Sequence, residues 1–97
     1  MQIQSSPRFI EKEAIPNLSF PKGDVLMLNS DKSRRLKDLL NANELGDLAQ
    51  YKVKILFEDQ TGPKKVETTI WKTTTTNVVL KYGITIPIRR IARVYFP

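Results

Sequence analysis

A chain of 97 residues, of which 40% are hydrophobic and 27% charged, has the composition of one globular domain rather than of a disordered tail. It contains no histidine and no cysteine, which excludes disulfide bonds, thiol nucleophiles, histidine bases and nearly all zinc sites. Its net charge of +6 arises entirely from Tyr51 onward, where nine basic residues face three acidic ones, and this excess favours a binding module with an acidic partner.

The remaining polar residues do not form a catalytic pattern. Glu58 and Asp59 are adjacent in a strand-like segment, so their carboxylates should point to opposite faces. The four glycines form no phosphate-binding loop. We therefore expect a protein that is not an enzyme and that uses no cofactor and no metal. No apolar run approaches the roughly 20 residues that span a bilayer, and the N-terminus lacks a signal-peptide pattern. We thus expect a cytoplasmic protein without a membrane partner.

Residues 1–23 are predicted to form an extended leader. Pro7, Pro16 and Pro21 interrupt this segment, which forbids a continuous helix and disfavours a central strand. The domain itself is assigned to residues 24–97. The leader carries five large apolar residues, a number that favours partial docking onto the domain over a free arm. They are Phe9, Ile10, Ile15, Leu18 and Phe20.

A helix is predicted at about residues 31–45. The Asn-Ser-Asp segment at 29–31 supplies side-chain oxygens that cap a helix N-terminus. The following leucines form an apolar stripe at helical spacing, and Gly46 is a candidate for the helix end. The basic residues of this segment are interrupted by acids, which is typical of a solvated helix face rather than of a ligand site. The leucines of the stripe are Leu36, Leu39 and Leu40.

Two strands, at about residues 51–59 and 64–73, are predicted to form a hairpin. Val53, Ile55 and Phe57 alternate with more polar residues, the period-2 pattern of a half-buried strand. A four-residue loop at 60–63 would close the hairpin and set Val53 against Ile70. This register would also create two cross-strand pairs of opposite charge, Glu58–Lys65 and Asp59–Lys64.

The same register would place Lys52 opposite Trp71 on the outer face of the hairpin. In one interpretation the Trp71 ring covers the stem of the lysine. In the other, Trp71 is an exposed aromatic ring beside a cation, which is suited to stacking a base. The sequence leaves both interpretations open.

Three further strands are predicted at about residues 77–82, 84–88 and 92–96. Gly83 permits a tight turn between the first two. Pro87 removes a backbone donor, so the second of these strands should be short, at a sheet edge or ending there. The Ile-Arg-Arg-Ile segment that follows predicts a single tight helical turn before the last strand.

A helix followed by five short, strongly bent antiparallel strands, with an Ile-Pro-Ile-Arg-Arg-Ile turn before the last, resembles the small five-stranded barrels. These are the SH3-like and Sm-like (Hfq-type) folds and the Rho-inhibitor and RNase P subunit type. The resemblance covers about residues 31–96 and implies a mainly β (α+β) fold, in which the helix-first order favours the Sm-like version. The stretch from Lys65 to Ile91 also looks like a group of short bacterial proteins without an assigned function. The chain lacks the Gly-Asn loop and the Tyr-Lys-His segment of Sm and Hfq proteins, so no RNA-binding residue is carried over from them.

The first functional hypothesis is binding of RNA or another single-stranded nucleic acid. Lysine and arginine would contact phosphates, and Trp71 or Tyr82 would stack a base. The clustered arginines near the C-terminus are the first candidates, because guanidinium groups bind phosphate in a bidentate way. The candidate residues are Lys52, Lys54, Trp71, Lys72, Lys81, Tyr82, Arg89, Arg90 and Arg93.

The second hypothesis is protein–protein interaction or assembly. Small barrels leave edge strands open to pairing, and the apolar leader could be an exchanged arm. Trp71 would then anchor the interface. Basic side chains that converge on one face together with Trp71 would favour nucleic acid. A buried Trp71 and an exposed apolar leader would favour a protein partner.

Overall fold

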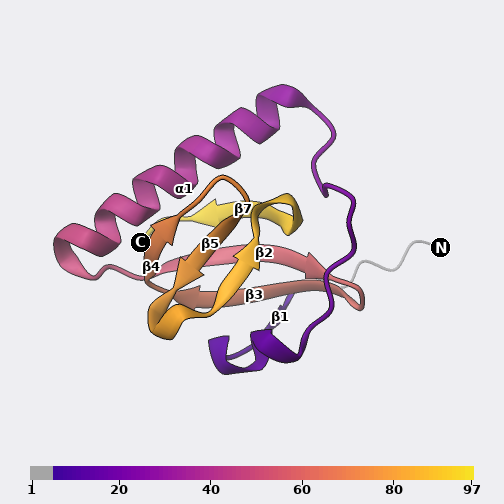
Figure 1. Cartoon of the computed structure of the whole chain (residues 1–97), viewed down its shortest axis with the longest axis horizontal. Helices are drawn as coiled ribbons and strands as arrows, with labels where there is room; N and C mark the ends of the chain where they lie inside the picture. Colours follow the sequence, from indigo (N-terminus) through magenta and orange to yellow (C-terminus); the bar gives the residue numbers. More distant parts are fainter. Residues whose placement is uncertain (1–5) are drawn as a thin grey trace.

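The computed structural model describes residues 6–97, so residues 1–5 of the predicted leader lie outside the described part of the chain. One long helix and two sheets of mostly antiparallel strands form an α+β fold (Figure 1). The helix α1 spans Asn29–Ala49, and three 3₁₀ helices are η1 (Lys12–Asn17), η2 (Lys81–Gly83) and η3 (Ile88–Arg90). The strands are β1 (Arg8–Phe9), β2 (Val53–Asp59), β3 (Gly62–Thr68), β4 (Ile70–Thr73), β5 (Asn77–Leu80), β6 (Thr85–Pro87) and β7 (Ile91–Tyr95).

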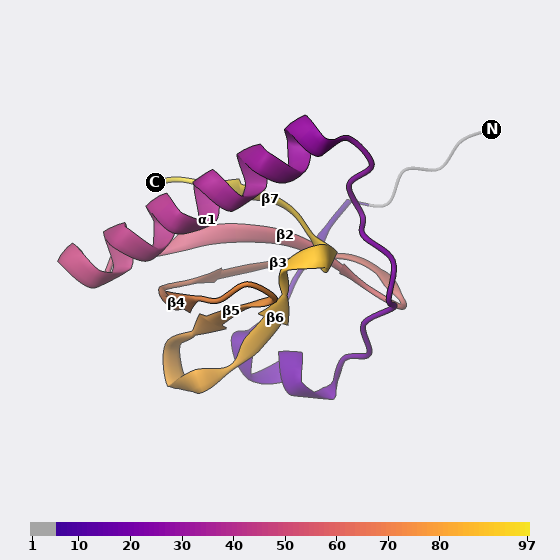
Figure 2. The same ribbon diagram turned by 45° about the horizontal axis from the view of Figure 1, so that its top comes forward.

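The strands form two sheets, and the five-stranded barrel predicted from the sequence is not confirmed, because no closed barrel is present within residues 6–97. The first sheet has the order β1-β3-β2-β7, and the second has the order β4-β5-β6. The predicted strand at 64–73 divides at Thr69, because β3 pairs with β2 whereas β4 pairs with β5. No ladder joins β6 to the first sheet within residues 6–97. In both views α1 lies along one side of the sheets and η1 along the opposite side (Figures 1 and 2).

The helix α1 is longer than predicted at both ends. Its N-cap is Leu28, whose carbonyl oxygen accepts hydrogen bonds from two N–H groups of the first turn, so side-chain capping by residues 29–31 is wrong. The helix continues through Gly46 and ends at Gln50, which adopts the left-handed conformation with φ 57°. Across residues 6–97, no helix has the length and apolar character that crossing a membrane requires.

The face that α1 buries differs from the predicted leucine stripe. Leu39 is fully buried, but Leu36 and Leu40 are exposed. The helix approaches β4 so closely that a Cβ atom on Gly46 would collide with the carbonyl oxygen of Ile70. Small side chains therefore face the sheet, and the flanking leucines are left in solvent. The buried row of the helix is Arg35, Leu39, Ala42 and Gly46.

β2 and β3 form the predicted hairpin, but its register is wrong by two residues. Val53 faces Thr68 rather than Ile70, and a two-residue turn replaces the four-residue loop. Glu58 accordingly faces Pro63 and not its predicted lysine. A shift of two residues keeps each side chain on its predicted face, because side chains alternate with a period of two.

Asp59 holds the hairpin turn together. Its Oδ1 accepts hydrogen bonds from the backbone N–H of Thr61 at 3.1 Å, the Thr61 hydroxyl at 2.9 Å and the Lys64 ammonium group at 2.9 Å. Burial favours the neutral carboxyl, but the hydrogen bonds from Lys64 and Thr61 outweigh it and lower the pKa of Asp59 below its usual value. The predicted Asp59–Lys64 ion pair thus forms, although the two residues are not directly opposed.

The second sheet follows the predicted order, with one shortened strand. β4 and β5 form a hairpin, and β5 ends at Leu80, before Tyr82 and Gly83, which both adopt positive φ, 68° and 79°. β6 ends at Pro87 and lies at the sheet edge, as predicted. The predicted helical turn is η3, after which β7 returns to pair with β2 in the first sheet.

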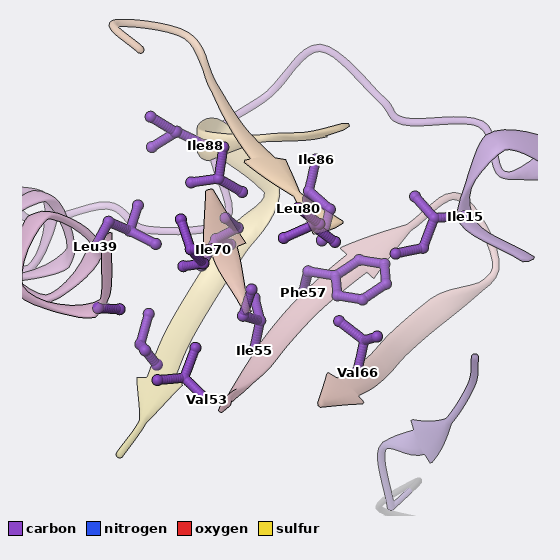
Figure 3. Packing of buried hydrophobic residues seen from close by; sticks show 14 residues of the cluster. Ile15, Leu39, Val53, Ile55, Phe57, Val66, Ile70, Leu80, Ile86 and Ile88 are labelled. Carbon is purple, nitrogen blue, oxygen red and sulfur yellow. The ribbon is translucent and has the colours of Figure 1, made fainter. Parts of the chain in front are cut away.

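One hydrophobic core lies between the two sheets and the helix (Figure 3). The inward residues of β2 meet those of the second sheet, and α1 closes one side through Leu39. On the opposite side η1 inserts Ile15, which is 2% exposed. The labelled core residues are Ile15, Leu39, Val53, Ile55, Phe57, Val66, Ile70, Leu80, Ile86 and Ile88.

The described part of the leader is docked, but it is not extended throughout. Residues 8–9 form β1, which pairs in parallel with β3 and covers that edge of the first sheet. Residues 12–17 form η1 around Pro16, and burial of Ile15 fixes this turn to the core. Ile10, Leu18 and Phe20 also pack against the core, whereas Phe9 is exposed, so the leader is partly docked, as predicted.

Candidate nucleic-acid interface

The outer face of the first sheet gathers basic and aromatic side chains. Directly opposed residues of neighbouring strands point to the same face. Lys54 on β2 is opposed to Tyr95 on β7, while Leu56 is opposed both to Arg93 on β7 and to Lys65 on β3. We call this surface the basic sheet face. It comprises Phe9, Lys54, Leu56, Lys65, Arg93 and Tyr95, together with one acid, Glu67, which is opposed to Lys54.

The cations of the basic sheet face lie over its aromatic rings. The Nζ of Lys65 is 4.9 Å from the ring centroid of Tyr95 and 5.7 Å from that of Phe9. The Nζ of Lys54 is 5.9 Å from the Phe9 ring, and the Cζ of Arg93 is 5.3 Å from the Tyr95 ring. All four distances are within the range of cation–π attraction. The positive groups and the stacking surfaces are therefore interleaved.

A hollow of about 250 Å³ lies along this surface. Its three lysines outnumber its one acid, and none of these lysines forms an ion pair with a carboxylate within residues 6–97. Their charge is therefore available to an anionic ligand. The lining residues are Lys52, Lys54, Lys65, Glu67, Tyr95, Phe96 and Pro97.

Trp71 on β4 and Tyr82 in η2 form a second aromatic group. Their ring centroids are 6.1 Å apart in an edge-to-face arrangement, and Trp71 is 44% exposed. The ammonium groups of Lys12 and Lys81 lie 5.3 Å and 5.5 Å from the Tyr82 ring. The predicted placement of Trp71 opposite Lys52 is wrong, because the shifted register leaves Trp71 beyond the end of the β2–β3 ladder.

Arg89 and Arg90, which the sequence favoured as phosphate ligands, bind backbone carbonyl groups. The Nε of Arg89 donates to the carbonyl oxygen of Pro21 at 3.2 Å. The Nη1 of Arg90 donates to Gly23 at 2.8 Å, and its Nε donates to Glu58 at 2.9 Å. These two arginines connect the leader to η3 and β2, using one N–H group of Arg89 and two of Arg90 within the fold.

The nine predicted site residues thus separate into groups. Lys52, Lys54 and Arg93 belong to the basic sheet face or its hollow, and Lys72 is exposed on the second sheet. The sequence prediction missed Phe9, Lys65 and Tyr95. Alternation along two strands could have found Lys65 and Tyr95, since Tyr95 lies two residues after Arg93. Phe9 had no such signal, because its place depends on the parallel pairing of β1 with β3.

Within residues 6–97, no group of three or more acidic side chains is arranged to hold a metal ion. No protein-family model, curated protein or solved structure matches this chain. The resemblances drawn from the sequence therefore remain predictions.

Proposed function

We propose that this protein binds single-stranded nucleic acid, RNA in particular, on the basic sheet face. The observation that carries the proposal is the interleaving of Lys54, Lys65 and Arg93 with the rings of Phe9 and Tyr95 on one surface. Proteins that bind single strands combine a positive surface that follows the phosphates with aromatic rings on which bases stack. Both components are present here within three neighbouring strands and the leader.

The binding mode follows from the geometry of the sheet. Phe9 is 57% exposed at one edge, and Tyr95 lies across the face on β7. A strand that crosses the sheet could stack one base near each ring, with its phosphates beside the lysines and Arg93. Stacking is available to every base, so the sheet face alone would bind with little sequence preference.

The test is fluorescence polarisation of a labelled single-stranded RNA at about 50 and 200 mM salt. We expect four phosphate contacts, from Lys52, Lys54, Lys65 and Arg93. They would give a slope near −2.8 for the logarithm of the association constant against the logarithm of the salt concentration, which is a loss of affinity of about 50-fold over this range. The double variant Lys54→Ala/Lys65→Ala should bind weakly, with a slope smaller in magnitude by about 1.4.

The matched control is Lys72→Ala/Lys81→Ala, which removes the same charge from β4 and η2, outside the basic sheet face. It should retain affinity close to that of the parent protein. Equal losses in the two double variants would mean that only total charge matters, which contradicts a site on the basic sheet face. No binding by the parent protein at 50 mM salt and micromolar concentration would reject the proposed function.

We also propose that the two sheets are the halves of an open barrel of the SH3-like or Sm-like type. Only Thr69 separates β3 from β4, so the order β7-β2-β3 continues through the chain into β4-β5-β6. The one-turn η3 before the last strand occupies the place that such a turn has in these barrels. This strand order supports the architectural proposal and carries no functional argument.

A second candidate function is binding of a protein partner through Trp71 and Tyr82. Tyr82 is 69% exposed and Trp71 partly exposed, and neighbouring exposed aromatic residues are typical anchors of interfaces. The docked leader does not support an exchanged arm, because β1 pairs within its own chain. A specific partner that the parent protein captures and the Trp71→Ala variant does not would support this function.

A further inference from the structure

A cleft of about 390 Å³ lies between α1 and β7, beside the basic sheet face. Its volume is within the range of small-molecule sites. From the helix, Asp31, Arg34 and Asp38 line it, at spacings that place them on one side of α1. From the strand side, Arg93 and the ring of Phe96 line it.

Of the charged side chains that line the cleft, Arg35 is already paired with Asp24, but the others form no ion pair within residues 6–97. Asp24 and Asp59 each form an ion pair with a short contact. Within residues 6–97, neither Asp31 nor Asp38 forms an ion pair or a side-chain hydrogen bond, and neither does Arg34. The cleft therefore presents unused carboxylate acceptors and guanidinium donors next to an aromatic ring.

The cleft is continuous with the basic sheet face. Arg93 lies on that face with Tyr95 and also lines the cleft. Phe96 lines both the cleft and the hollow of the sheet face. A strand bound across the sheet would therefore pass the mouth of the cleft as it leaves β7.

We propose that the cleft receives a guanine base from the strand bound on the basic sheet face. This inference rests on the proposed function and adds base selectivity to it. The carboxylate of Asp38, which is half-buried, accepts from the adjacent N1–H and N2–H groups of guanine. Arg34 or Arg93 donates to O6 and N7, and Phe96 packs against the plane of the ring.

Guanine is the base whose hydrogen-bonding groups fit this set best. Among the bases, only guanine has two neighbouring N–H donors, N1–H and N2–H, that can bind both oxygens of one carboxylate. It also has two neighbouring acceptors, O6 and N7, that can bind two N–H groups of one guanidinium. Adenine places an acceptor, N1, where guanine has a donor, and a carboxylate would repel it. Cytosine offers one amino group to a carboxylate and has a smaller surface to bury.

The experiment compares four labelled nine-residue RNAs: nine adenosines, and the same strand with its central base changed to guanine, cytosine or inosine. The parent protein should bind the guanine strand roughly tenfold or more tightly than the all-adenosine strand, the discrimination expected of one bidentate base contact. Inosine lacks only the 2-amino group and should give an intermediate affinity. In the Asp38→Asn variant the guanine preference should disappear while the all-adenosine strand still binds.

The matched control is Asp47→Asn, which removes the same charge from the same helix outside the cleft and should keep the guanine preference. Equal affinity of the parent protein for all four strands would overturn the guanine inference and leave the proposed function standing, and so would a preference for cytosine. A guanine preference that survives in Asp38→Asn would also overturn it.

A second measurement uses free nucleotides and does not depend on strand binding. Titration with guanosine monophosphate, followed by amide chemical shifts, should move the signals of residues 31–38 and 92–96 in a saturable way, and adenosine monophosphate should not. If no RNA binds and neither nucleotide moves these signals, both the proposed function and the cleft inference fail. If no RNA binds but guanosine monophosphate alone moves them, the cleft is a guanine site and the strand-binding function fails.

Discussion

Asp24 and Arg35 form a bidentate ion pair that joins the segment before α1 to the buried face of that helix. The Nη1 and Nη2 atoms of Arg35 each lie 2.8 Å from a different carboxylate oxygen of Asp24. Nη1 also donates to the carbonyl oxygen of Ile91 at 3.0 Å, so the pair reaches β7 as well. Arg35 is only 8% exposed, and its charge would be costly at this position without Asp24.

Replacement of Asp24 by Asn should destabilise the protein by about 3 kcal/mol, because it leaves the buried guanidinium group without its counter-ion. Urea unfolding at pH 7 measures this difference. The control Glu44→Gln removes an exposed carboxylate from the middle of α1 and should change the free energy of unfolding by less than about 0.5 kcal/mol. A loss in Asp24→Asn no larger than in this control would show that the ion pair does not stabilise the fold.

The same pair predicts how stability depends on acid pH. The hydrogen bonds from Arg35 lower the pKa of Asp24 from 3.8 to about 2. The folded protein therefore binds fewer protons at this site than the unfolded chain, so the stabilisation is complete above about pH 4 and is lost as the pH falls toward 2. For this partly exposed carboxyl we expect a contribution of about 1–2 kcal/mol.

Unfolding of the parent protein and of Asp24→Asn between pH 2 and pH 5 checks this sign. The difference in stability between the two should shrink as the pH falls. A difference that is constant over this range would contradict the assigned shift, because other carboxyls titrate equally in both proteins.

Gly46→Ala should be destabilising, although glycine to alanine changes inside a helix are usually stabilising. The added Cβ would collide with the backbone carbonyl of Ile70, and a β-strand backbone cannot move aside as a side chain can. We expect a loss of about 1–3 kcal/mol in thermal or urea unfolding. Gly23→Ala is the control, because nothing lies within 4 Å of its Cβ position. Equal stability of the two variants would place α1 further from β4 than the structure does.

Phe9→Ala should weaken RNA binding at least about fivefold, the lower limit for loss of one stacked base. Because Phe9 is largely exposed on a two-residue strand, the melting temperature should change little. Tyr82→Ala removes an exposed ring from η2 and should leave RNA affinity unchanged. If Tyr82→Ala weakens binding and Phe9→Ala does not, the strand follows the second sheet instead of the basic sheet face.

Much of the fold could be predicted because alternation and composition are local signals. The helix, the central hairpin and the short edge strand at Pro87 all follow from such patterns. The hairpin register could not, since a shift of two residues buries the same side chains on the same face. Charge pairing favoured a four-residue loop, but the hydrogen bonds that Asp59 accepts from Thr61 stabilise a two-residue turn.

The buried face of the helix could not be predicted from the sequence either. When the distance between the helix and the sheet is unknown, leucines at helical spacing are the best indication of which side of the helix faces the core. Here α1 approaches β4 closely at Gly46, Ala42 and Gly46 are buried, and Leu36 and Leu40 are exposed. The prediction of the candidate site was incomplete for a similar reason. Strand alternation places side chains on a face, but the contribution of Phe9 depends on a contact between residues far apart in the chain.

The leader has a consequence for synthesis of the protein on the ribosome. Its residues 8–9 leave the ribosome early, yet they pair with residues 64–65. The carbonyl groups of Pro21 and Gly23 bind arginines of η3, near the C-terminus. Residues 8–9 must therefore remain undocked until residues 64–65 have been synthesised, and Pro21 and Gly23 until η3 follows, so the edge of β3 is open until β1 docks. During this interval the nascent chain depends on rapid completion, or on a chaperone, to keep that edge from pairing with other chains.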